Sequence, residues 1–134
     1  MGLNMFEVTI TPQFADINPL GYVNNSIVGN WFEVGRNNFF RFFTPKLDFE
    51  NWELILVKNT QKFLKHMIFN ENVTIKTYVS HIGNTSFTLY HEAYQSGELK
   101  ATGTAVLVNF DFEKQTKKPI KPSIKAKLEK HLKT

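Results

Sequence analysis

The sequence predicts an α+β fold in which an antiparallel sheet curls around one long apolar helix. The expected elements come in the order strand, helix, four strands and a short helix, and the long helix is apolar around most of its circumference. An ordinary surface helix buries about a third of its circumference, so a wide sheet must wrap around this one. The 134 residues, 42% of them hydrophobic, fit a single domain over residues 1–134.

The first strand and the loop after it have clear local patterns. Phe6, Val8 and Ile10 alternate with polar residues, which predicts a half-buried strand. Residues 16–25 are polar and contain Asn18-Pro19 and Gly21, which indicates a structured loop between this strand and the helix.

The long helix is expected over residues 26–43. Asn24, Asn25 or Ser26 can cap its start, and Pro45 lies just beyond its end. Hydrophobic residues cover most of its surface and leave one narrow polar stripe at helical spacing, made of Asn30, Glu33, Asn37 and Arg41. We therefore expect this helix to be largely enclosed.

The rest of the chain predicts the sheet that encloses the helix. Extended stretches are expected over residues 52–66, 72–82, 85–95 and 99–112. Gly83-Asn84 and Ser96-Gly97 have the composition of tight hairpin turns between them. A short helix over 123–132, apolar on one stripe, completes the chain.

Composition and charge exclude several classes of function. There is no cysteine, so disulfides, thiolate catalysis and thiolate metal sites are excluded. Residues 114–134 contain eight Lys and one Glu and carry +7, whereas residues 1–113 carry −3. Because these lysines lack interleaved aromatic residues, we expect a solvated helix face and no nucleic-acid partner. The sequence lacks the pattern of a signal peptide and a membrane-spanning apolar run, which favours a cytoplasmic protein.

Residues 13–25 followed by 31–36 (WFEVGR) resemble the hot-dog-fold acyl-CoA thioesterases of the 4-hydroxybenzoyl-CoA thioesterase type. That family has D-x-D-x-x-G-x-V-N-N or V-N-H in the loop and F-E-x-x-R on the helix. Residues 82–86 (IGNTS), 101–109 (ATGTAVLVN) and 118–122 (KPIKP) extend the resemblance in the same order. It implies a five-stranded antiparallel sheet around the helix, a homodimer or higher homo-oligomer, and active sites at the subunit interface.

The resemblance also implies an oxyanion donor, the backbone N–H of Asn25. The family's usual catalytic carboxylate falls on Asn18 here, and an amide cannot act as a general base or a nucleophile. The family's common His falls on Tyr22. We therefore expect Asn18 and Tyr22 to position substrate or water, and Glu33 to be the carboxylate that activates water.

Further residues are candidates for substrate binding. Those in the loop and helix are Asp16, Val23, Asn24 and Trp31, and those expected to contact the nucleotide are Lys58, Lys62, Gly83, Asn84 and Thr85. Asp16 and Asn24 can equally bond the turn and cap the helix, and the lysines can be plain surface residues. None of the four histidines lies in the 16–25 loop, and no two have metal-ligand spacing, so no metal and no separate cofactor is expected.

These observations support two functions of different class. The first is hydrolysis of an acyl thioester of coenzyme A or of acyl carrier protein, with coenzyme A present only as part of the substrate. The second is a protein that binds an acyl thioester without hydrolysing it, because the usual catalytic Asp is Asn18. A hydratase is less well supported, because the loop lacks the Asp/His pair that this chemistry needs.

Overall fold

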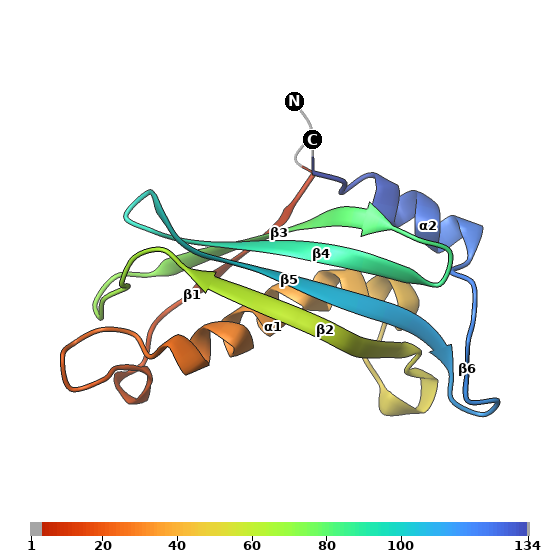
Figure 1. Ribbon diagram of the computed structural model, residues 1–134, viewed down its shortest axis with the longest axis horizontal. Helices are drawn as coiled ribbons and strands as arrows, with labels where there is room; N and C mark the ends of the chain where they lie inside the picture. The colour runs from red at the N-terminus through yellow and green to blue at the C-terminus, as the bar shows by residue number, and fades with distance from the viewer. Residues whose placement is uncertain (1–3, 134) are drawn as a thin grey trace.

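The computed structural model describes residues 4–133, which form a curved antiparallel sheet with one long helix packed across it (Figure 1). The strands are β1 (Phe6–Ile10), β2 (Leu54–Phe63), β3 (Val73–Ile82), β4 (Ser86–Gln95), β5 (Glu98–Asp111) and β6 (Thr116–Lys117). The helices are α1 (Asn25–Phe43) and α2 (Pro122–Glu129), with 3₁₀ turns at Phe14–Asp16 and Phe49–Asn51. The order across the sheet is β1-β3-β4-β5-β2, and β6 pairs with the end of β5. The hot-dog fold expected from the sequence is confirmed.

The alternating pattern of the strands places their apolar side chains under α1. In β3, Val73, Ile75, Thr77 and Val79 are fully buried, whereas the alternate residues between them are more exposed. Glycines let the helix approach the sheet closely: a Cβ at Gly35 would lie 2.6 Å from Thr77 Oγ1, and one at Gly103 would lie 2.8 Å from the Phe32 ring. Small residues at these two positions therefore set the distance between α1 and the sheet.

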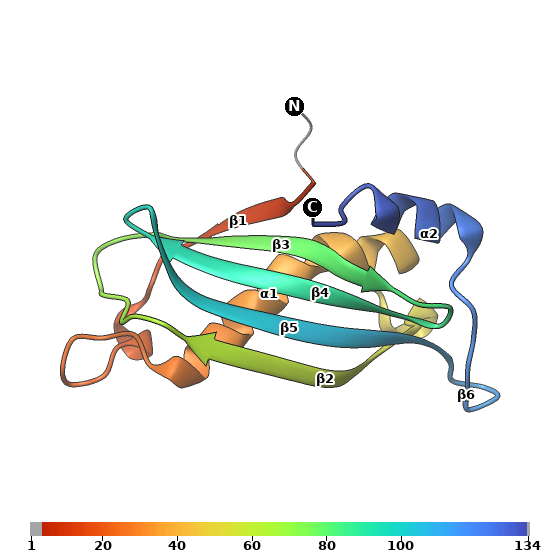
Figure 2. The ribbon, with the colours of Figure 1, turned by 45° about the horizontal axis from the view of Figure 1, so that its top comes forward.

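Two hydrophobic clusters divide the core along the helix. One surrounds the C-terminal half of α1 and includes Phe39, Phe43 and Leu128 of α2. The other surrounds the N-terminal half and includes Val28 and Phe32. Figure 2 shows α1 crossing behind the sheet between these two ends, so the loop before α1 and the segment after it lie far apart.

Strand β2 forms one edge of the sheet. Every residue from Leu56 to Phe63 is exposed, and among residues 4–133 no strand pairs with the outer side of β2. The exposed residues include Val57, which is 56% exposed, and Val34 of α1 is 43% exposed. The expectation that α1 is enclosed therefore holds on the side that faces β3 and β4, but not on every side.

Several boundaries differ from those expected. Helix α1 begins one residue earlier than expected, at Asn25, and α2 ends at Glu129 rather than at residue 132. The extended stretch expected over 52–66 is a strand only over Leu54–Phe63, because the regular pairing with β5 ends there: the N–H groups of Leu64 and Lys65 both donate to Lys100 O. The two-residue strand β6 and the 3₁₀ turns are too short to leave a periodic pattern in the sequence.

Candidate active site

The loop before α1 is built around Asn18. Its Oδ1 accepts hydrogen bonds from the backbone N–H groups of Leu20 at 2.9 Å and Tyr22 at 3.2 Å. Its own backbone N–H donates to Tyr22 O at 2.8 Å, and Gly21 adopts a φ of +87° that favours glycine. The amide oxygen of Asn18 is therefore already used to close this turn, a role that the sequence alone did not indicate.

The chain between β2 and β3 packs against this loop. Tyr22 forms an isolated antiparallel bridge with Ile68, and the N–H of Val23 donates to Met67 O at 2.8 Å. The ring of Tyr22 stacks on the imidazole of His66, with 4.1 Å between centroids and an interplanar angle of 11°. His66 is exposed, and it is a chemically versatile residue at this site that sequence reasoning missed.

The N-terminus of α1 follows directly from this loop. Asn24 is the N-cap residue, but its side chain makes no capping hydrogen bond, so the expected cap is not formed by Asn24. Its backbone N–H donates to Asp16 O at 2.8 Å, and Asp16 Oδ2 accepts from the N–H of Gln13 at 2.8 Å. The first N–H groups of a helix have no partner inside the helix, and they attract negative charge. Asn25 is exposed and supplies the first of them.

Other candidates from the sequence lie away from this point. Glu33 is exposed and lies eight residues beyond Asn25, which is about 12 Å along the helix axis. Within one chain, the structure therefore does not bring Glu33 and Asn25 to one reacting carbonyl. Trp31 and Val23 are 6% and 5% exposed and pack in the core beside the loop.

A buried polar cluster ties α1 to the sheet. Arg36 is 4% exposed, and its Nε donates to Nε2 of the fully buried His91 at 3.1 Å. His91 Nδ1 lies 3.1 Å from Thr77 Oγ1, so a neutral imidazole protonated on Nδ1 can satisfy both contacts. Burial, and then the charge of Arg36, lower the pKa of His91 to about 3, while burial lowers the pKa of Arg36. His91 is therefore neutral near pH 7 and acts as a structural acceptor.

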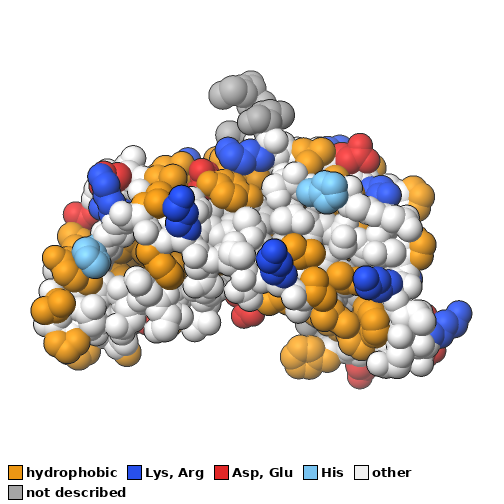
Figure 3. All heavy atoms as spheres, viewed as in Figure 1, with side chains coloured by type: hydrophobic (Ala, Val, Ile, Leu, Met, Phe, Trp, Pro, Cys, Tyr) orange, Lys and Arg blue, Asp and Glu red, His pale blue; other side chains and the backbone are white. Residues whose placement is uncertain are grey.

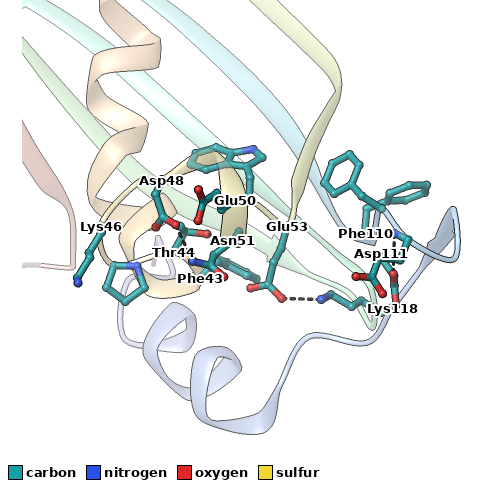
Figure 4. A pocket seen from close by; sticks show the side chains of 14 residues that line it. Phe43, Thr44, Lys46, Asp48, Glu50, Asn51, Glu53, Phe110, Asp111 and Lys118 are labelled. Carbon is teal, nitrogen blue, oxygen red and sulfur yellow. Dashed lines mark hydrogen bonds and ion pairs between the residues drawn. The ribbon is translucent and has the colours of Figure 1, made fainter.

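A pocket with a volume of about 700 Å³ opens at the opposite end of α1. Figure 4 shows its lining, which combines aromatic side chains with an ion pair between Lys118 Nζ and Glu53 Oε1 at 2.5 Å. The aromatic residues are Phe43, Trp52, Phe110 and Phe112. None of the predicted site residues lines this pocket. On the face seen in Figure 3, hydrophobic side chains gather at both ends of the molecule.

The residues expected to contact a nucleotide also lie apart from the loop. Lys58 and Lys62 alternate with Gln61, which faces α1, and so they point to the other side of the sheet. Residues 83–85 form the hairpin at the end of the sheet opposite the loop, where Asn84 O accepts from the N–H of Ile120 at 2.9 Å. Among residues 4–133 there is no metal-binding group of three or more acidic or histidine side chains, and no helix is long and apolar enough to cross a membrane.

Comparison with known proteins identifies the family. A model of the thioesterase-like superfamily matches residues 12–128, which is most of the chain and includes the loop, α1 and strands β2 to β6. The chain belongs to the thioesterase-like superfamily. Among curated proteins no sequence matches it.

Solved structures of known and predicted thioesterases have the same fold. A predicted thioesterase from Bacillus stearothermophilus is 37% identical, with a TM-score of 0.93 over 97% of this chain and 98% of that chain. A thioesterase from Thermus thermophilus, complexed with coenzyme A and Zn, is 23% identical, with a TM-score of 0.82 over 95% and 92%. A mutant 4-hydroxybenzoyl-CoA thioesterase complexed with 4-hydroxybenzoyl-CoA is 15% identical, with a TM-score of 0.77 over 93% and 99%. For the two structures at 23% and 15% identity, the likeness concerns the fold alone.

Proposed function

We propose that this member of the thioesterase-like superfamily hydrolyses an acyl thioester of coenzyme A or of acyl carrier protein. The observation that carries the proposal is the start of α1, where Asn25 is an exposed residue, its N–H has no partner inside the helix and Asn24 makes no side-chain cap. Two thioesterases of similar fold, one complexed with coenzyme A and one with 4-hydroxybenzoyl-CoA, support this class of substrate.

The chemistry needs a donor for the carbonyl oxygen of the thioester. When water attacks the carbonyl carbon, negative charge develops on that oxygen, and a preorganised N–H stabilises it. In this proposal the Asn25 N–H is that donor, and the helix N-terminus adds its positive partial charge. Two hydrogen bonds within the loop would hold this donor in place. Asn18 N–H donates to Tyr22 O, and Asn24 N–H, next to Asn25, donates to Asp16 O.

The complete site would be formed by two copies of the chain. An exposed edge strand such as β2 favours pairing with a second copy, and an antiparallel pair sets the start of one β2 beside the end of the other. The start of α1 lies over the end of β2, since a Cβ at Gly29 would lie 2.6 Å from Gln61 Nε2. Trp52 and Glu53 of the aromatic pocket precede the start of β2. The loop of one copy would thus face the pocket of the other.

In this arrangement the loop of one copy and the aromatic pocket of the other would bind different parts of the substrate. The loop and the start of α1 would hold the thioester carbonyl, and the aromatic pocket of the second copy would hold apolar substrate groups. Residues 83–85 and the pocket residues Lys46 and Lys118 would then lie close to the phosphate groups of coenzyme A or of acyl carrier protein. These assignments would let the loop and residues 83–85, which are separated in one chain, serve one substrate.

One observation favours the alternative of a protein that only binds acyl thioesters. Asn18 occupies the position of the family's usual carboxylate, and its Oδ1 accepts two backbone N–H groups, which leaves it little capacity to direct a water. A protein with this loop could hold a thioester carbonyl at Asn25 and lack the base that completes hydrolysis.

Thiol release from a panel of acyl-CoA and acyl carrier protein substrates distinguishes the two functions, together with equilibrium binding of a non-hydrolysable acyl-CoA analogue. Hydrolysis predicts turnover by the unmodified protein. Binding without turnover, with activity gained in Asn18→Asp, would establish the alternative. Neither binding nor turnover with any member of the panel would contradict both.

A further inference from the structure

The proposed hydrolysis lacks a proton acceptor among the residues that the family pattern points to. Asn18 has an amide where the family has a carboxylate, and its oxygen closes the turn. Asp16 Oδ2 accepts the N–H of Gln13, and Glu33 lies about 12 Å along α1 from Asn25. Within one chain, a water held near the Asn25 N–H therefore needs a base other than these three residues.

The pairing between the loop and the segment after β2 brings His66 to this place. Tyr22 pairs with Ile68, and Val23 N–H bonds Met67 O, so the next step of the antiparallel register sets His66 opposite Asn24. Asn24 immediately precedes Asn25 at the start of α1. In an antiparallel pair, side chains two residues apart lie on one face, so Tyr22, Asn24 and His66 share a face.

The stack on Tyr22 fixes the orientation of the imidazole. The two ring centroids are 4.1 Å apart, and the planes are nearly parallel at 11°. His66 is an exposed residue and forms no ion pair among the residues that the structure describes. Imidazole is the side chain that proteins use most often as a general base.

We propose that His66 is the general base of this site, in place of the carboxylate that Asn18 lacks; this rests on the proposed thioester hydrolysis. A ring nitrogen of His66 accepts a proton from water as the water oxygen forms a bond to the thioester carbon. The carbonyl oxygen meanwhile bonds the Asn25 N–H. The carbon–sulfur bond then breaks, and the imidazolium returns the proton to the leaving thiolate, which yields one carboxylic acid and one thiol. Tyr22 is a positioning residue, since it holds the His66 ring.

The other histidines do not suit this role. His91 is fully buried, and its two ring nitrogens form hydrogen bonds with Arg36 and Thr77. His131 packs against the rings of Phe6 and Phe39 near the opposite end of α1. His81 is exposed at the far end of β3, two residues before the hairpin, and makes a matched control for removal of an exposed imidazole.

The test compares thiol release by the unmodified protein with that of His66→Ala, His66→Gln and His81→Ala. Loss of a general base lowers kcat by about 10²–10⁴-fold, so both His66 variants should fall by that much while KM changes little. His81→Ala should stay within about twofold of the unmodified protein, because it changes an exposed residue to which the proposal gives no role. Added imidazole should restore part of the turnover of His66→Ala, which a merely structural role for His66 would not produce.

The outcomes separate this proposal from the function on which it rests. Turnover by the unmodified protein that survives in His66→Ala to within about threefold overturns the role of His66 and leaves the proposed hydrolysis standing. No turnover by the unmodified protein overturns the hydrolysis itself, and the role of His66 with it. Far-ultraviolet circular dichroism and the melting temperature of each variant check that the fold is kept.

Discussion

Replacement of Asn25 by proline would remove one backbone N–H from the start of α1 with little change in the fold. Proline is well tolerated at the first position of a helix, because the N–H there has no partner inside the helix and the fixed φ suits it. The residue before it, Asn24, has φ −64° and ψ 130°, a conformation that a following proline accepts. Helix α2 of the same chain already begins with Pro122. The substitution therefore isolates the proposed oxyanion donor.

The magnitude follows from the loss of one donor. Removal of an oxyanion-hole hydrogen bond typically lowers kcat by about 10²–10³-fold, which corresponds to about 2.7–4 kcal/mol of transition-state stabilisation. We expect Asn25→Pro to show this loss in thiol release, with a melting temperature close to that of the unmodified protein. Asn25→Ala keeps the N–H and loses the side-chain amide, so the fall in Asn25→Pro beyond that in Asn25→Ala measures the N–H itself. If both variants have the same kcat, the Asn25 N–H does not stabilise the transition state.

Three further predictions concern the fold and its edge. In Gly35→Ala the new Cβ would meet Thr77 Oγ1 at 2.6 Å, so chemical denaturation should show a free energy of unfolding lower by about 1–3 kcal/mol; an unchanged value would mean that α1 can move away freely. Because the pKa of His91 is lowered to about 3, its contribution to stability is present above pH 6.5 and is lost as the pH falls toward 3. NMR titration should find His91 neutral at pH 5, and a protonated His91 at pH 5 would contradict the buried cluster. Val57→Asp places a charge on the exposed β2 edge and should convert a dimer to a monomer in light scattering, whereas an unchanged mass would move the interface elsewhere.

Much of the fold follows from local patterns in the sequence. The alternation of Val73, Ile75 and Val79 predicted β3 correctly, because one face of that strand is fully buried. The apolar helix was also predicted to within one residue of its start. The exposure of Val34 could not be predicted, since it depends on the absence of a covering strand along one flank of α1, which is a property of the whole sheet.

The site was less predictable because its contacts are not local. His66 reaches Tyr22 only through the bridge between Tyr22 and Ile68, and neither residue lies in a sequence pattern that indicates the pairing. Arg36 has the polarity of a surface residue, but the structure buries it against His91. Asn18 closes the loop that leads to Asn25 at the start of α1, whereas Glu33, chosen as a carboxylate in the polar stripe of the helix, lies two turns from Asn25 within one chain.

The central claim is that this chain turns over an acyl thioester rather than only holding one. The most direct measurement counts the thiol released per protomer when the unmodified protein is mixed with a large excess of acyl-CoA. Catalysis predicts many equivalents of thiol per protomer, released at a steady rate until the substrate is consumed. No thiol above the uncatalysed background, or release that stops at one equivalent, would contradict it and would favour a binding protein built on a thioesterase fold.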